Sequence, residues 1–137
     1  RQRQMCIRDR QSVPHIDGHN SYRFALIHYL NSSAHGGTAF YRHNPTGYER
    51  VSQANEKNFW RSFDQYIEQY GKPDAGYIDN SNDHFQKIGE VPYQANRLLL
   101  YPGNLLHSGS IIPENDVDSN PNTGRLTANI FLNFVEQ

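Results

Sequence analysis

The chain has 137 residues, which is long enough for one domain and short for two. Hydrophobic residues make up 36% and charged residues 20%, and a formal net charge of −1 gives no electrostatic case for binding nucleic acid or an anionic membrane. The single cysteine excludes an intrachain disulfide, and no apolar run is long enough to cross a bilayer. No signal peptide is visible, so we expect a cytoplasmic protein.

Residues 1–10 differ from the rest of the chain. They show no strand or helix period, and they contain its only methionine and its only cysteine. Back-translated, their second half resembles the end sequence of a transposon used to prepare sequencing libraries. We interpret residues 1–10 as an assembly artefact and exclude them from the fold, the alternative being a genuine basic, disordered tail. On this interpretation residues 11–137 form one domain, truncated at its N-terminus.

The first part of this domain predicts two strands. Residues 11–17 indicate a short strand, and a turn-like segment follows it. Residues 22–30 are aromatic and aliphatic on both faces, which is typical of a strand covered on both sides. Arg23 and His28 are the polar members of this second strand, and we expect both to be satisfied structural groups.

The middle of the chain predicts two further strands and the one clear helix. Residues 36–41 begin a strand after a glycine pair, and residues 84–91 indicate an edge strand. Between them, apolar and aromatic residues recur every three to four positions over residues 52–70, which predicts a helix. Ser52 is a suitable N-cap and Gly71 provides a stop. We expect this helix to pack against its own domain.

Towards the C-terminus, residues 96–101 indicate a buried strand and residues 102–104 a turn. Residues 105–109 then form the return strand, so the sequence predicts a hairpin that carries His107. Residues 113–124 are acidic and asparagine-rich, without an apolar period, and we expect a surface loop there.

The last strand, residues 125–134, alternates between an apolar face and a more polar face that includes Arg125 and Thr127. If the polar face met solvent, this would be an ordinary surface strand. If it turned inward, it would bring an arginine and a threonine to a ligand. Many short strands, turns and one helix together predict a mainly β domain, a β-barrel or jelly roll with the helix packed outside.

Candidate metal ligands lie in two predicted strands that are far apart in the sequence. In an extended chain His15 and Asp17 point to the same face, because side chains two positions apart do so. His107, far along the chain, could add a third ligand. Two histidines and one carboxylate, with other positions open, form the facial triad of non-haem Fe(II) oxygenases. His19 would share the same face and could replace Asp17, but we favour Asp17 because it keeps the carboxylate.

Taken in order, these motifs make the chain resemble the 2-oxoglutarate- and Fe(II)-dependent dioxygenases, especially the prolyl-hydroxylase-like branch and its uncharacterised bacterial groups. The matching motifs, from first to last, are His15-Ile16-Asp17, the Arg23-led strand ending in Tyr29-Leu30-Asn31, Gly36-Gly37-Thr38-Ala39-Phe40, Pro102-Gly103 before His107-Ser108-Gly109, and Arg125-Leu126-Thr127. The glycine-pair motif is one residue shorter than in the family. The gap from His107 to Arg125 is longer than usual, which puts the assignment of Arg125 in doubt.

The resemblance implies a double-stranded β-helix, a jelly-roll or cupin-like barrel, with iron at its open end. His15, Asp17 and His107 would hold Fe(II). Arg125 would pair with the distal carboxylate of 2-oxoglutarate, a match that suits a planar guanidinium, and Thr127 would add a hydroxyl hydrogen bond. Tyr29 is a further candidate contact for the co-substrate, as are Tyr22 and Tyr41.

The activity that the resemblance implies is hydroxylation of a C–H bond with O₂, with release of succinate and CO₂. The substrate could be a small molecule or a peptidyl side chain, and no substrate motif is recognisable. The alternative is a non-catalytic barrel of the same fold that binds a metal or a small ligand. A cupin-like metalloprotein with another chemistry is a third interpretation.

Overall fold

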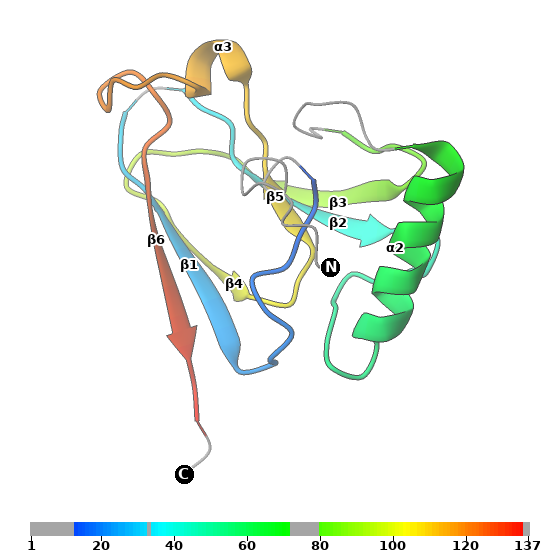
Figure 1. Ribbon diagram of the computed structural model, residues 1–137. Helices are drawn as coiled ribbons and strands as arrows, with labels where there is room; N and C mark the ends of the chain where they lie inside the picture. Colours follow the sequence, from blue (N-terminus) through cyan, green and yellow to red (C-terminus); the bar gives the residue numbers. More distant parts are fainter. Residues whose placement is uncertain (1–12, 33, 72–79, 136–137) are drawn as a thin grey trace.

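The computed structural model of the chain describes residues 13–32, 34–71 and 80–135 (Figure 1). The interpretation of residues 1–10, and the first two residues of the strand expected at 11–17, lie outside this part. Within the described residues, no helix has the length and apolar character needed to cross a membrane. The elements are β1 (Arg23–Tyr29), β2 (Thr38–His43), α2 (Glu56–Tyr70), β3 (Phe85–Val91), β4 (Leu98–Pro102), β5 (His107–Gly109), α3 (Pro113–Asp116) and β6 (Thr127–Asn133).

The strands form two three-stranded sheets, ordered β4-β1-β6 and β3-β2-β5, and every pairing is antiparallel. The two sheets face each other in a sandwich-like arrangement (Figure 1). Residues of both sheets line a cavity between them. The predicted mainly β class is confirmed, as is the position of β3 at a sheet edge. The register sets Ala25 opposite both Tyr101 and Phe131, so the inward faces of three strands meet over the cavity.

The main apolar core lies between α2 and the β3-β2-β5 sheet. Phe59 is the buried anchor of the helix, and Phe63 packs beside it. The predicted helix is confirmed, but it begins at Glu56 because Asn55 turns its side chain back to the backbone N–H of Ser52. Gly71 ends the helix with a φ of 85°, a left-handed conformation that favours glycine. The cluster consists of Ala39, Tyr41, Val51, Phe59, Phe85 and Leu106.

The predicted hairpin of β4 and β5 is wrong. β4 pairs with β1, whereas β5 pairs with β2 in the other sheet. The predicted turn is present, since the N–H of Leu105 donates to the carbonyl of Pro102 at 3.0 Å, but it carries the chain from one sheet to the other. At His107 both edges of β5 are occupied, by Phe40 of β2 and by His15, so β4 has no free edge to join there.

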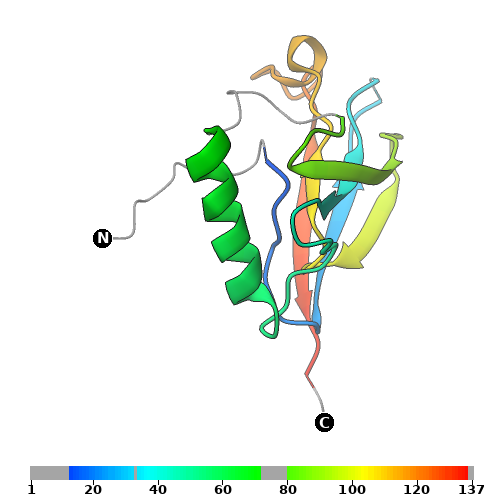
Figure 2. The same cartoon turned by 90° about the vertical axis from the view of Figure 1, so that its right-hand side faces the viewer.

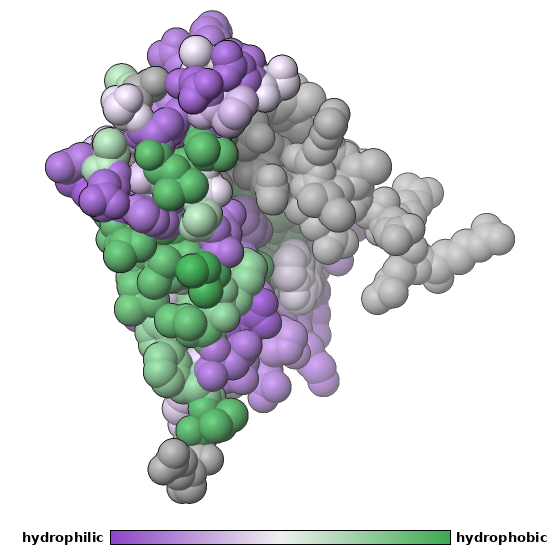
Figure 3. All heavy atoms as spheres, turned by 90° about the vertical axis from the view of Figure 1, so that its left-hand side faces the viewer, coloured by the Kyte–Doolittle hydropathy of each residue, from purple (hydrophilic) through white to green (hydrophobic). Residues whose placement is uncertain are grey.

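The outer face of the β4-β1-β6 sheet is apolar and exposed (Figure 3). The strand predicted at 22–30 was expected to be covered on both sides, but its outward residues are only half-buried. The strand predicted at 96–101 was expected to be buried, but Leu98 and Leu100 are exposed. The β6 alternation explains this, because its polar face turns inward to the cavity and its apolar face outward. The most exposed members of this face are Leu98, Leu100, Ile130 and Phe134, each more than half exposed.

The loop predicted at 113–124 contains the short helix α3 and is anchored by one buried carboxylate. Asp116 accepts hydrogen bonds from the N–H groups of Ile112, at 2.7 Å, and Gly36, and it pairs with His35 Nδ1 at 2.8 Å. Its backbone carbonyl accepts from the N–H of Arg125 at 3.1 Å. The loop is mostly exposed as expected, but this anchor fixes the start of the last strand.

Candidate metal centre

Two backbone hydrogen bonds bring together histidines that lie 92 positions apart in the sequence numbering (107 minus 15). The N–H of His15 donates to the carbonyl of His107 at 2.9 Å, and the N–H of His107 donates to the carbonyl of His15 at 3.0 Å. Directly opposed residues of an antiparallel pair present their side chains on the same face. The segment expected as a strand is thus reduced to a single bridge, and that bridge falls on the predicted ligands.

Asp17 is placed by the next hydrogen bond along the same segment. Its N–H donates to the carbonyl of Gly103 at 2.8 Å, and the N–H of Gly103 donates to the carbonyl of Arg23 at 2.8 Å. The segment before β1 is thereby held between α2 and the β4-β1-β6 sheet (Figures 1 and 2). One ligand atom from each of His15, Asp17 and His107 lies within 4.8 Å of the others, a grouping that could hold a metal ion.

His19, the alternative ligand, points elsewhere. Its side chain is half exposed, and its Nδ1 lies 3.3 Å from Oε2 of Glu56 at the start of α2. Among the residues that the structure describes, it is Asp17 and not His19 that joins the two histidines. The extended geometry assumed from the sequence does not continue past Asp17, and the turn after it separates the two candidates.

The hydrogen bonds of the two ligand histidines fix which ring nitrogen is free. Nδ1 of His15 lies 2.9 Å from the carbonyl of Val13, and Nδ1 of His107 lies 2.7 Å from the carbonyl of Leu105. A carbonyl oxygen can only accept, so each Nδ1 carries the proton and each neutral ring keeps its lone pair on Nε2. Metal-bound histidines are oriented by this kind of second contact.

The pKa shifts of His15 and Asp17 favour the protonation states that bind a metal ion. Burial, followed by the nearby His107, lowers the pKa of His15 and keeps its ring neutral. Burial alone would raise the pKa of Asp17, but the hydrogen bond and charge of a protonated His107, then the charges of His15 and Arg23, outweigh it and the pKa is lowered. A neutral imidazole and an ionised carboxylate are the forms that bind metal.

Nε2 of His107 lies 3.3 Å from Oδ2 of Asp17. With Nδ1 committed to Leu105, a neutral His107 would turn one lone pair towards another at this distance. Such an arrangement is stable only with a cation between the two atoms, either a proton on Nε2 or a metal ion. The donor set of two imidazole nitrogens and one carboxylate oxygen fits Fe(II) with open coordination positions.

The three ligands line one end of the cavity between the sheets, which has a volume of about 260 Å³. Tyr101 also lines it, with its buried ring 4.7 Å from that of His107. Burial, then the charge of Asp17, raises the pKa of Tyr101, so its hydroxyl stays protonated as a donor. From the sequence, Tyr101 was predicted only as a strand residue, although its place just before the turn to His107 could have pointed to the site. Thr38, Asn129 and Phe131 line the cavity and were also not predicted.

The residues expected to bind the co-substrate lie at the other end of the cavity. Arg125 and Thr127 line it, whereas Tyr29 is fully buried beneath them and shares a 2.7 Å hydrogen bond with Thr38 Oγ1. The guanidinium carbon of Arg125 lies 5.6 Å from the centre of the Tyr29 ring. Two other tyrosines were named as candidates and line no part of the cavity: Tyr41 is buried in the core, and Tyr22 is half exposed.

Backbone carbonyls hold Arg125 in place. Its Nε donates to Gly36 at 2.8 Å and its Nη2 to Gly37 at 3.2 Å. A Cβ atom on Gly36 would lie 1.3 Å from the carbonyl oxygen of Ser110, so only glycine allows this close approach of the backbone. Arg125 also lines the cavity, so a ligand bound there would meet this side chain.

Comparisons with known proteins add a family but no activity. No curated protein and no solved structure is significantly similar to the chain. One family model matches residues 2–132, almost the whole length, and its description is a family of unknown function. The chain therefore belongs to the DUF6445 family.

Proposed function

We propose that this protein is an Fe(II)- and 2-oxoglutarate-dependent dioxygenase that hydroxylates a C–H bond of a small molecule or a peptidyl side chain. The observation that carries the proposal is the convergence of one ligand atom each from His15, Asp17 and His107, within 4.8 Å of one another, in a cavity between two sheets. The finer fold that belongs to this proposal is a double-stranded β-helix. The two antiparallel sheets and their order are compatible with it.

In this proposal the protein residues position the metal and the co-substrate, and the metal supplies the oxidative chemistry. His15, Asp17 and His107 would hold Fe(II), which supplies the oxidation of 2-oxoglutarate by O₂ to succinate and CO₂ together with transfer of one oxygen atom to the substrate. Arg125 and Thr127 would bind the distal carboxylate of the co-substrate. The buried Tyr29 would support Arg125 from below, because its ring lies under the guanidinium.

The test is an anaerobic titration of the protein with Fe(II) and 2-oxoglutarate, followed through the weak visible charge-transfer band of the chelate. We expect the band with the natural sequence, and succinate formation once O₂ and a substrate are supplied. Arg125→Gln should weaken 2-oxoglutarate binding roughly ten- to hundredfold, the value of a charge-assisted pair, and leave Fe(II) affinity unchanged.

The matched control is Arg97→Gln. Arg97 is also half-buried and also donates to a backbone carbonyl, that of Pro92 at 2.6 Å, but it does not line the cavity. We expect it to leave the co-substrate affinity unchanged. An absent band, or equal effects of the two substitutions, would contradict the proposal.

One observation favours a second candidate, a non-catalytic metal-binding module. Part of the Arg125 guanidinium is already committed to Gly36 and Gly37, so this arginine could be structural. Fe(II) binding without any effect of 2-oxoglutarate in the same titration would select this candidate.

A further inference from the structure

Arg23 differs from the other half-buried arginines of the described chain. Arg97 and Arg125 both donate to backbone carbonyls. Arg23 has no hydrogen bond or ion pair from its side chain among the described residues, and its Nε is buried without a partner. A buried donor without a partner costs roughly 1–3 kcal/mol, so its presence in a folded protein calls for an explanation. The expectation of a satisfied structural group is therefore not met at Arg23.

The stem of Arg23 is nevertheless held in a fitted cradle. A Cβ atom on Gly18 would lie 3.0 Å from Cδ of Arg23, and one on Gly103 would lie 3.4 Å from its Cγ. The guanidinium carbon lies 4.8 Å from the centre of the Phe131 ring, a cation–π contact. Two glycines and a phenylalanine from three separate segments thus fix the side chain, while its charge remains without a counter-ion in contact.

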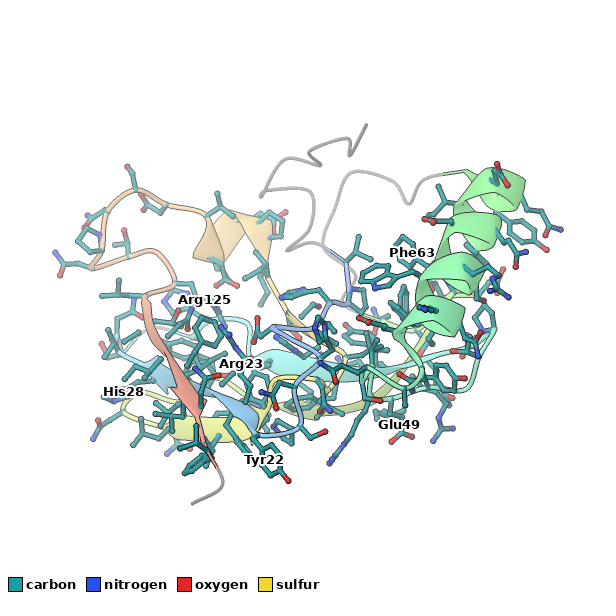
Figure 4. All side chains as sticks on the ribbon, turned by 60° about the horizontal axis from the view of Figure 1, so that its bottom comes forward. Tyr22, Arg23, His28, Glu49, Phe63 and Arg125 are labelled. Carbon is teal, nitrogen blue, oxygen red and sulfur yellow. The ribbon has the colours of Figure 1, made fainter. Side chains whose placement is uncertain are left out.

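Arg23 also occupies a definite place relative to the metal ligands. It lies on the same inward face of β1 as Ala25 and Tyr29, and its stem lies against Gly18, the residue after Asp17. The Phe131 ring on which it rests lines the cavity. Figure 4 shows Arg23 and Arg125 on the same side of the β1–β6 pair. Arg125 lies near the end of β1 and Arg23 at its beginning. Arg125 lines the cavity together with the triad, whereas Arg23 lies against Phe131 of the cavity wall.

We propose that Arg23 is the binding group for a carboxylate of the substrate, so that the protein acts on a small organic acid, such as an amino acid with a free carboxyl group. A carboxylate is the anion that a planar guanidinium binds with two parallel hydrogen bonds. Bound there, the acid would enter from the Asp17 side of the metal, opposite the end that holds Arg125. The identity of this ligand as a substrate rests on the proposed function, whereas the anion site itself does not.

The experiment uses the Zn(II)-loaded protein and ligand-observed saturation-transfer NMR. The probes are a panel of N-acetyl amino acids, each compared with its own C-terminal amide, which has the same shape without the charge. At least one acid should bind roughly tenfold more tightly than its amide, the value of one charge-assisted interaction. Arg23→Gln should remove this preference, and Arg23→Lys should keep part of it.

Arg42→Gln is the matched control, because Arg42 is exposed and pairs with Glu49 at 2.5 Å outside the cavity. It should leave the preference for acids unchanged. Thermal melts of each variant show that the comparison is made on folded protein. Zn(II) affinity should also stay unchanged in Arg23→Gln; a parallel loss of metal would mean that Arg23 acts through Asp17 and would overturn the proposal.

Three other results would overturn it as well: no acid that binds better than its amide, a preference that survives Arg23→Gln, or full displacement of the acid by 2-oxoglutarate. The same NMR samples separate this proposal from the proposed function. An Arg23-dependent preference for acids without 2-oxoglutarate binding would keep the anion site and reject the dioxygenase. Binding of 2-oxoglutarate without the preference would do the reverse.

Discussion

Two pairs of histidines lie on opposite faces of the β3-β2-β5 sheet, and only one of them meets a carboxylate. His15 and His107 open onto a cavity beside Asp17. His43 and His84 lie under α2, at 0% and 2% exposure, with their Nε2 atoms 2.9 Å apart. The rings of Phe59, Phe63, Tyr66 and Phe85 surround this second pair.

The difference lies in where the lone pairs go. Nδ1 of His43 lies 2.7 Å from Thr46 Oγ1, and Nδ1 of His84 is buried without a partner in the described structure. A buried bare lone pair costs less than a buried N–H, so we infer that Nε2–H of His84 donates to Nε2 of His43. Nδ1–H of His43 then donates to Thr46. In this pair the two Nε2 atoms bind each other, whereas in the other pair Nε2 of His107 faces a carboxylate oxygen of Asp17. Two neighbouring histidines are therefore not enough to make a metal site.

The largest effect is expected from removing one of the ligand histidines, His15 or His107. His15→Ala or His107→Ala should lower Fe(II) affinity at least about hundredfold, since loss of an outer contact alone costs ten- to hundredfold. Anaerobic titration calorimetry measures this. His84→Phe keeps a ring in the buried pair and should leave the affinity unchanged. Tight stoichiometric binding that persists in both alanine variants would rule out the triad.

The buried pair, His43 and His84, should make the free energy of unfolding depend on pH. Burial lowers the pKa of His43 and of His84 to about 4, with His43 also acting on His84. Between about pH 6.5 and pH 4 the unfolded chain binds protons at both histidines and the folded chain does not. The free energy of unfolding should therefore fall by several kcal/mol as the pH decreases through this window. Urea denaturation at a series of pH values measures it.

The control for this pH dependence is the double variant His43→Phe and His84→Phe. Other groups titrate in the same window, but the variant lacks the two buried imidazoles, so its stability should vary less steeply between pH 6.5 and 4. An equally steep decrease in the double variant would place the acid sensitivity elsewhere in the molecule.

The sequence was sufficient for the features that depend on local spacing. The side chains of His15 and Asp17 converge because they are two positions apart in an extended segment, and the alternation of β6 correctly separated Thr127 from its apolar neighbours. His107 could be chosen because it follows a turn signal. These inferences need only the period of a strand and the geometry of a turn.

The sequence could not predict which strand edge or which sheet face would be covered by a distant part of the chain. The turn after β4 gave no sign that β5 would join β2, because that choice depends on His15 and Phe40 occupying the two edges of β5. Likewise, Arg23 lacks a partner because Gly18, Gly103 and Phe131 meet around it from separate segments. The exposed outer face of the β4-β1-β6 sheet is a third case, since an apolar strand does not reveal whether anything covers it.

The smallest expected effect tests the direction of the buried hydrogen-bond chain. Thr46→Val keeps the side-chain shape but removes the acceptor of His43, so Nδ1–H would become a buried donor without a partner, at a cost of about 1–3 kcal/mol of unfolding free energy. Thr123→Val, which removes an exposed hydroxyl that bonds to Asp118, should cost at most about 0.5 kcal/mol. Urea midpoints measure both, and ¹⁵N shifts of the His43 ring report its tautomer. If Thr46→Val proved no more destabilising than the control and the shifts placed the proton of His43 on Nε2, the chain would run the other way. His43 would then donate to His84, and the orphaned Nδ1 of His84 would carry a hydrogen rather than a lone pair.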